Sequence, residues 1–173
     1  MDLAQFINGS SSLLFLVSTG KAFHASKLIA WKASNLALVV TSFLCNAYGF
    51  EKKLLLLDYL TIYMISASYI QTFYINIPYT IVLVYEWKMY RSIENTKNLA
   101  FATAITRSIM NTYLHVSKTY SYLLVISFIG GSLIYKIRYS LYNTNKKQNI
   151  LWMTYVFHIC MTTILYISSI TAV

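Results

Sequence analysis

The chain contains few residues that break helices or carry negative charge. Its 173 residues include one proline, Pro78, five glycines and five acidic residues, whereas 57% are hydrophobic. Charged residues make up 11% of the chain, but soluble domains usually carry about 25%. This composition excludes an ordinary soluble domain, and its continuous apolar runs favour long helices over strands. We therefore predict an all-α integral membrane protein.

Cysteine is scarce as well, and the positive charge is dispersed. Cys45 and Cys160 both lie in apolar segments, which argues against a secreted disulfide framework. The net charge of +9 comes from Lys and Arg in short clusters between apolar runs, as in the loops of membrane proteins. We expect no nucleic-acid partner, because such binders carry a continuous basic patch. Asp2 stands where a signal peptide has basic residues, so we expect the first span to be retained.

The charge clusters divide the chain into seven candidate spans. A helix needs roughly 20 residues to cross a bilayer core about 30 Å thick. The first, third and seventh candidates are the clearest, whereas the fourth contains Pro78 and Glu86 and the fifth contains Arg107, so six or five spans are alternatives. Glu86 and Arg107 would form a structural ion pair if both segments cross the membrane. We expect residues 1–173 to form one multi-pass domain of about seven helices, at 3–20, 28–49, 54–74, 76–90, 97–115, 118–136 and 149–171.

The distribution of basic residues predicts the orientation, because they accumulate on the cytoplasmic side. With seven spans, Lys21, Lys27 and Lys118 lie on one side, and most other basic residues lie on the side of the N-terminus. We therefore predict a cytoplasmic N-terminus and an external or lumenal C-terminus. The one N-glycosylation motif, Asn8-Gly9-Ser10, would then stay unmodified. The residues on the N-terminal side are Lys52, Lys53, Lys88, Arg91, Lys97, Lys136, Arg138, Lys146 and Lys147.

Asp58 is the most unusual residue, because it is a carboxylate within the apolar run 54–70. An ionisable side chain inside a bilayer costs about 2.5 kcal/mol or more, so it is usually paired, lines a wet cavity or takes part in chemistry. The alternation of seven spans brings the end of the second, the start of the third and the start of the seventh to the same side. Residues 41–46, 57–59 and 152–158 would therefore meet.

Two polar pairs in these segments have helical spacing. Ser42 and Asn46 are four residues apart, as are Thr154 and His158, so each pair shares one face of a helix. One interpretation is packing, because Ser, Thr and Asn commonly join membrane helices at about 0.6 kcal/mol each. A buried histidine is likewise often a hydrogen-bonded core residue. The other interpretation is a functional site around Asp58.

Together these residues resemble the signature of a seven-helix membrane superfamily that unites alkaline ceramidases, progestin and adipoQ receptors, and myomaker-like proteins. The pattern here is Ser42-x-x-x-Asn46, then Asp58, then Thr154-x-x-x-His158. In the superfamily three histidines hold zinc, and a serine and an aspartate support the zinc-bound water. The resemblance implies that His158 is a metal ligand and that Asp58 and Ser42 are the catalytic pair. Asn46 and Thr154 stand at the other two metal positions, where histidines would be.

These departures leave several chemical interpretations open. A catalytic zinc usually takes three protein ligands and one water, and it lowers the pKa of that water to about 7. Asn46 and Thr154 are weak zinc ligands beside imidazole, so loss of the metal is the main expectation. A rebuilt zinc site of Asp58, His158 and Cys45 is one alternative. A triad of Ser42, His158 and Asp58 is another, which depends on mutual hydrogen bonding.

Three functions follow from these interpretations. The first is a divergent, metal-depleted scaffold that binds a membrane lipid or a membrane protein partner. The second is an intramembrane zinc-dependent lipid amidase or esterase of the ceramidase type. The third is an unrelated multi-span transport or structural protein. A retinal protein is disfavoured, because residues 149–171 contain no lysine for a Schiff base.

Overall fold

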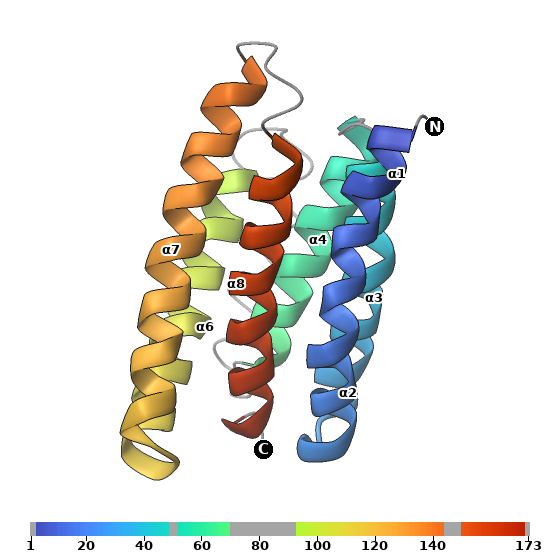
Figure 1. Ribbon diagram of the computed structural model, residues 1–173. Coiled ribbons are helices and arrows are strands. Elements are labelled where there is room, and N and C mark those ends of the chain that lie inside the picture. The colour runs from blue at the N-terminus through green and yellow to red at the C-terminus, as the bar shows by residue number, and fades with distance from the viewer. Residues whose placement is uncertain (1–2, 49–51, 70–92, 144–149, 172–173) are drawn as a thin grey trace.

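The protein is described by a computed structural model, which covers residues 3–48, 52–69, 93–143 and 150–171. All regular structure in these residues is helical, which confirms the all-α class. The first three elements, which cover residues 3–25, form one continuous rod (Figure 1). The elements are α1 (Leu3–Ser10), the 3-10 helix η1 (Ser11–Leu14), α2 (Phe15–Ala25), α3 (Ile29–Ala47), α4 (Lys52–Tyr69), α6 (Ile93–His115), α7 (Lys118–Asn143) and α8 (Ile150–Thr171).

The helices pack around a closed circuit. The rod contacts α3, α3 contacts α4, α4 contacts α6, α6 contacts α7, α7 contacts α8, and α8 returns to the rod. We call the end that holds α1 the upper end and the end that holds the end of α8 the lower end, as oriented in Figure 1. The end of α3 and the starts of α4 and α8 all lie at the upper end. The three segments therefore share one end of the bundle, as the alternation of spans predicts, with α3 packed against α4 and α8 packed against the rod.

Most predicted spans coincide with helices, but their ability to cross a membrane differs. The fourth, at residues 76–90, lies outside the described residues. Among the described residues, two helices are long and apolar enough to cross a membrane, over Lys118–Arg138 in α7 and Trp152–Thr171 in α8. They correspond to the sixth and seventh predicted spans. Because only these two helices qualify among the described residues, seven spans are not supported there. The prediction of a single domain over residues 1–173 stays a prediction.

The sequence explains why other helices are less apolar than expected. The rod is interrupted by η1, so neither the part before it nor the part after it is long. In α4 the charged residues Lys52, Lys53 and Asp58 lie within 18 residues. Polar side chains also lower the apolarity of α3, where the buried residues include Ser34, Asn35, Thr41, Ser42 and Asn46.

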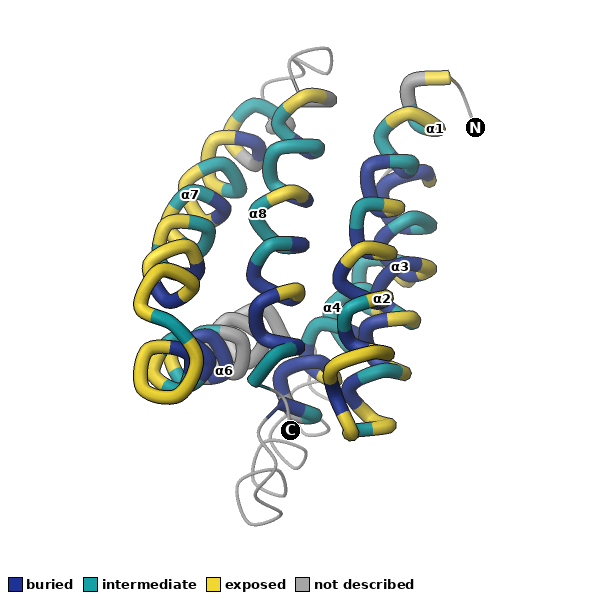
Figure 2. Tube along the Cα trace, turned by 60° about the horizontal axis from the view of Figure 1, so that its bottom comes forward, coloured by how far each residue is buried: buried dark blue, intermediate teal, exposed yellow. Residues whose placement is uncertain are grey.

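The interior of the bundle is rich in polar side chains beside two hydrophobic clusters, and its surface is rich in apolar side chains. Among the described residues, buried polar side chains outnumber buried hydrophobic ones. The outer face of α7 exposes a row of large apolar side chains, and this face is marked as exposed in Figure 2. Soluble proteins bury mostly apolar side chains, whereas membrane helices often associate through small and polar residues. The exposed residues of α7 include Tyr122, Ile126, Ile129, Leu133 and Ile137.

Serines shape the upper half of the rod. The Ser10 hydroxyl donates a hydrogen bond to the Ile7 carbonyl at 2.7 Å. The Ser11 hydroxyl donates to the Asn8 carbonyl at 2.6 Å. Such bonds from serine to the preceding turn compete with the regular helix pattern, and the rod tightens into η1 from Ser11 onward. Ser11 and Ser12 are both buried in this segment.

Hydrogen bonds between side chains also tie the lower end together around α8. The Trp31 indole donates to the Ser169 hydroxyl at 3.0 Å and joins α3 to α8. Tyr69 and Thr171 share a hydrogen bond of 2.9 Å between α4 and α8. A third bond, 2.8 Å long, joins Ser108 of α6 to Ser168 of α8. The lower ends of these four helices are therefore held at one level.

Gly9 allows α1 to approach α3 closely, which gives a first testable expectation. A Cβ atom at Gly9 would lie 2.8 Å from the Ala47 Cβ and 3.2 Å from the Phe43 carbonyl oxygen. We expect Gly9→Ala to lower the free energy of unfolding by about 1–3 kcal/mol, because backbone atoms must move. Thermal unfolding of the protein in detergent measures the change.

Gly20 offers the matched control, because a Cβ there has nothing within 4 Å. Gly20→Ala lies within α2, so it should stabilise the protein by about 0.5–1 kcal/mol through helix propensity. Equal effects of the two substitutions would contradict the close approach of α1 and α3.

Candidate functional site

Asn46 joins three helices at the upper end. Its side chain is buried and its amide nitrogen donates to the Ser42 carbonyl at 2.8 Å and the Ser42 hydroxyl at 3.2 Å. Its side-chain oxygen accepts a hydrogen bond of 2.9 Å from the Arg138 guanidinium of α7. The Asn8 amide of α1 donates to the Asn46 backbone carbonyl at 3.1 Å. The polar groups of Asn46 are thus engaged by α1, α3 and α7.

Arg138 is a buried cation that the sequence interpretation placed in a loop. Helix α7 continues to Asn143, so Arg138 is helical, and it is only 7% exposed. Lys136 lies two residues earlier and is exposed, since residues two apart in a helix point to different faces. Sequence spacing thus allows one of these cations to face inward, but it does not say which. The hydrogen bond to Asn46 identifies Arg138 as the inward one.

His158 is buried between aromatic rings and bonded to the rod. It is 2% exposed, and its Nδ1 lies 2.8 Å from the Ser11 hydroxyl. Its ring centroid lies 4.9 Å from that of Phe15 and 5.6 Å from that of Phe157. Ser11 has one hydroxyl proton, which it donates to the Asn8 carbonyl, so His158 Nδ1 is the donor toward Ser11. The histidine therefore anchors the rod and does not withdraw a proton from Ser11.

Ser42 is linked to His158 through two neighbouring serines of η1. The Ser12 hydroxyl donates to the Ser42 hydroxyl oxygen at 3.1 Å, while adjacent Ser11 contacts His158. We call Asn8, Ser11, Ser12, Ser42, Asn46, Arg138 and His158 the polar cluster. A catalytic triad of Ser42, His158 and Asp58 requires a bond from serine to histidine, and the structure places Ser11 in that position instead. The triad interpretation is therefore not the observed arrangement.

Asp58 and Thr154, the remaining predicted site residues, lie beside the cluster. Asp58 of α4 and Arg138 of α7 are both close enough to the buried Cys45 thiol to act on it electrostatically. Arg138 acts on His158 in the same way. Thr154 is fully buried one turn before His158 on α8. All five residues predicted from the sequence thus come from the upper halves of α3, α4 and α8.

The donor set around His158 does not suit zinc. Within the described ranges, no group of three His, Cys, Asp or Glu side chains is placed to hold a metal ion. The Asn46 side-chain oxygen at one superfamily metal position accepts a hydrogen bond from a guanidinium. That fixed positive charge would repel a dication, and an amide oxygen and a hydroxyl are weak zinc ligands. The residues present therefore do not fit a catalytic zinc.

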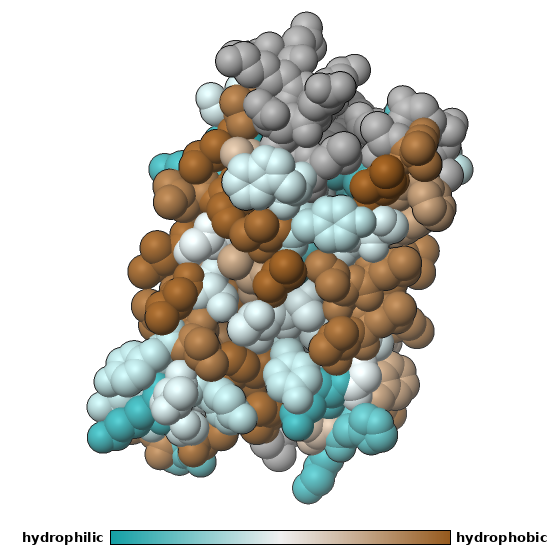
Figure 3. Space-filling view, in the orientation of Figure 1, coloured by the Kyte–Doolittle hydropathy of each residue, from teal (hydrophilic) through white to brown (hydrophobic). Residues whose placement is uncertain are grey.

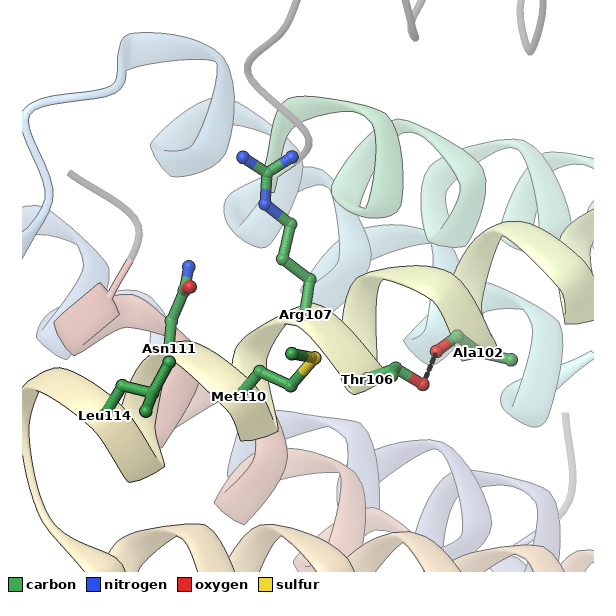
Figure 4. Close-up of a pocket in the computed structure, with 6 residues that line it drawn as sticks. All are labelled: Ala102, Thr106, Arg107, Met110, Asn111 and Leu114. Carbon is green, nitrogen blue, oxygen red and sulfur yellow. Dashed lines mark hydrogen bonds between the residues drawn. The ribbon is translucent and has the colours of Figure 1, made fainter.

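An open depression on α6 is separate from the cluster. Figure 4 shows its lining, with the side chains of Arg107 and Asn111 extending from one face of the helix. The Thr106 hydroxyl donates to the Ala102 carbonyl at 2.9 Å, so its hydrogen-bond partner lies within α6. Glu86, the predicted partner of Arg107, lies outside the described residues. The lining residues are Ala102, Thr106, Arg107, Met110, Asn111 and Leu114.

The bond between Asn8 and Asn46 gives a second expectation. Glycan transfer uses the asparagine side-chain nitrogen, and in Asn8 this atom donates to the Asn46 carbonyl. Together with a cytoplasmic N-terminus, this bond leads us to expect no glycan on Asn8 in eukaryotic cells. The electrophoretic mobility of the protein with and without glycosidase treatment checks this, and a shift on treatment would contradict it. A glycan on Asn8 would contradict both this bond and the predicted cytoplasmic N-terminus.

No protein-family model, curated protein or solved structure matches the chain.

Proposed function

We propose that the chain is a multi-pass membrane protein with about seven spans and a cytoplasmic N-terminus. Two apolar helices of sufficient length support the membrane location. The distribution of side chains supports it further, because many polar side chains are buried and many large hydrophobic ones are exposed, unlike in a soluble protein. Figure 3 shows this apolar surface over the middle of the bundle. The basic residues of the sequence support the orientation.

We further propose that it is a divergent, metal-depleted member of the superfamily of alkaline ceramidases and adipoQ receptors. The hydrogen bond from Arg138 to Asn46 carries this proposal. Asn46 stands where the superfamily has a histidine ligand, so a protein cation binds the group that would otherwise bind the metal. The cluster thereby keeps a positive charge beside Asn46 without a metal ion.

Its function is then to bind a membrane lipid or a membrane protein partner, and hydrolysis is lost. The hydrogen-bonding roles of the polar cluster support a structural site. Ser11 accepts from His158, and the Ser42 oxygen accepts from both Ser12 and Asn46. No hydroxyl in this arrangement is paired with a base that removes its proton, as nucleophilic catalysis requires. The cluster fixes α1, α3, α7 and α8 to one another and leaves the apolar outer faces for lipid or a partner helix.

Restoring the superfamily ligands tests this proposal. A variant with Asn46→His and Thr154→His has three histidines at the superfamily positions, and Arg138→Leu removes the competing cation. We expect this triple variant to bind about one zinc per chain, because a catalytic site needs three protein ligands. The matched control is the same double histidine variant with Arg138 retained, which should bind less zinc. Equal, negligible zinc in both would contradict the assignment to the superfamily.

A further inference from the structure

The lower end of the bundle carries lysines whose ammonium groups lie over aromatic rings. A cation within about 6 Å of a ring centroid is attracted by the ring face. Two of the pairs lie on the side of α2, α3 and α8, and the third lies at the junction of α6 and α7. From Nζ to ring centroid, the pairs are Lys21 with Tyr166 at 5.4 Å, Lys32 with Phe23 at 5.7 Å and Lys118 with Tyr113 at 5.6 Å.

These pairs hold the ammonium groups along the outer rim of the bundle. The three rings are themselves on the surface, because Tyr166 is 38%, Phe23 is 52% and Tyr113 is 44% exposed. A lysine resting on an exposed ring extends along the outside of the helices. We call Lys21, Lys32 and Lys118 the lysine collar.

The collar lies at the level where the helices end. Bonds from Trp31 to Ser169 and from Tyr69 to Thr171 hold the ends of α3, α4 and α8 together there. Lys118 begins α7 at the same end. Just above, the surface is apolar, and hydrophilic residues appear at the lower edge in Figure 3. The collar therefore marks the boundary between the apolar surface and the polar end.

The electrostatic character of this boundary is positive. Lys27, His24 and His115 are exposed at the same end. Among the side chains that the structure describes, no Asp or Glu lies there, since Asp58 belongs to the upper half of α4. The collar is thus not neutralised by a described carboxylate. A ring of cations at an apolar boundary matches the position of phosphate groups in a bilayer.

We propose that the lysine collar binds the headgroups of anionic membrane lipids, whose acyl chains run along the apolar faces above it. The cations lie on the sides of the bundle, where lipid headgroups would surround it. This position favours a lipid over a soluble polyanion, which would approach the end of the bundle from the solvent. Stacking on the rings fixes each ammonium before the lipid arrives, so less side-chain entropy is lost on binding. This surface is independent of the polar cluster at the upper end.

Native mass spectrometry of the full chain in detergent tests the collar. The protein is titrated with dioleoyl phosphatidylglycerol or dioleoyl phosphatidylcholine, and the bound lipids are counted. We expect the wild type to prefer phosphatidylglycerol. The variant Lys21→Gln, Lys32→Gln and Lys118→Gln should lose that preference roughly tenfold or more, because one lysine near an anionic surface changes affinity by about fivefold.

Two exposed lysines of the upper end, Lys53 and Lys136, provide the control. Their joint replacement by glutamine should leave the preference within twofold of the wild type. Lys118→Gln alone, at an exposed position, serves if the triple variant does not purify, with an expected loss of about fivefold. An unchanged preference in the collar variant, or an equal loss in the control, would overturn the proposal.

Discussion

Replacing Arg138 by alanine will lower the free energy of unfolding by about 3 kcal/mol, as expected when a buried charged interaction loses one partner. The guanidinium is 7% exposed and donates to the Asn46 side-chain oxygen at 2.9 Å. Without it this buried oxygen loses its charged donor. Unfolding by sodium dodecyl sulfate in mixed micelles, followed by circular dichroism, measures the change.

Lys136 provides the matched control, because it is exposed and lies one half-turn away on the same helix. Lys136→Ala should change the stability by less than about 0.5 kcal/mol. In a double-mutant cycle, Arg138→Ala and Asn46→Ala should couple by about 1–3 kcal/mol. A coupling near zero would show that the hydrogen bond between them does not hold α3 to α7.

The second large effect is expected at His158. His158→Ala should destabilise the protein by about 3 kcal/mol, because it opens a cavity beside Phe15 and removes the donor to Ser11. The side chain is 2% exposed, so little relaxation into solvent or lipid is available. The same unfolding assay measures this loss.

His24 gives the comparison for this position. It is exposed near the end of α2, so His24→Ala should change stability by less than about 0.5 kcal/mol. Ser11→Ala should reproduce part of the His158 effect, about 1–2 kcal/mol, because it leaves the His158 donor unsatisfied. A Ser11→Ala variant as stable as the wild type would show that this contact does not anchor the rod.

Helix positions were predictable from the sequence because each apolar run extends over about 20 residues and is bounded by charged residues. The predicted spans at 28–49 and 149–171 match α3 (Ile29–Ala47) and α8 (Ile150–Thr171) closely. The prediction for α7 stopped at residue 136, whereas the helix continues to Asn143. The reason is that a basic residue was taken as the start of a loop, although an inward-facing cation with a partner can remain helical.

The site was predictable only in part. Helical spacing and the alternation of spans brought Ser42, Asn46 and His158 to one end, as the structure has them. The partners that decide their chemistry are Arg138 and Ser11, which are distant in sequence and follow no fixed spacing from them. Three consecutive serines, at residues 10–12, were a visible polar segment in the first span. No pattern in one sequence indicates that such a segment meets a histidine near the C-terminus.

The zinc content of the detergent-purified wild type and of His158→Ala, by elemental mass spectrometry, decides whether the polar cluster holds a metal ion. We predict no zinc in either protein, because Arg138 supplies the positive charge at the Asn46 position. About one zinc per wild-type chain, lost in His158→Ala, would contradict it. That result would place His158 in a rebuilt metal site and restore the lipid hydrolase interpretation.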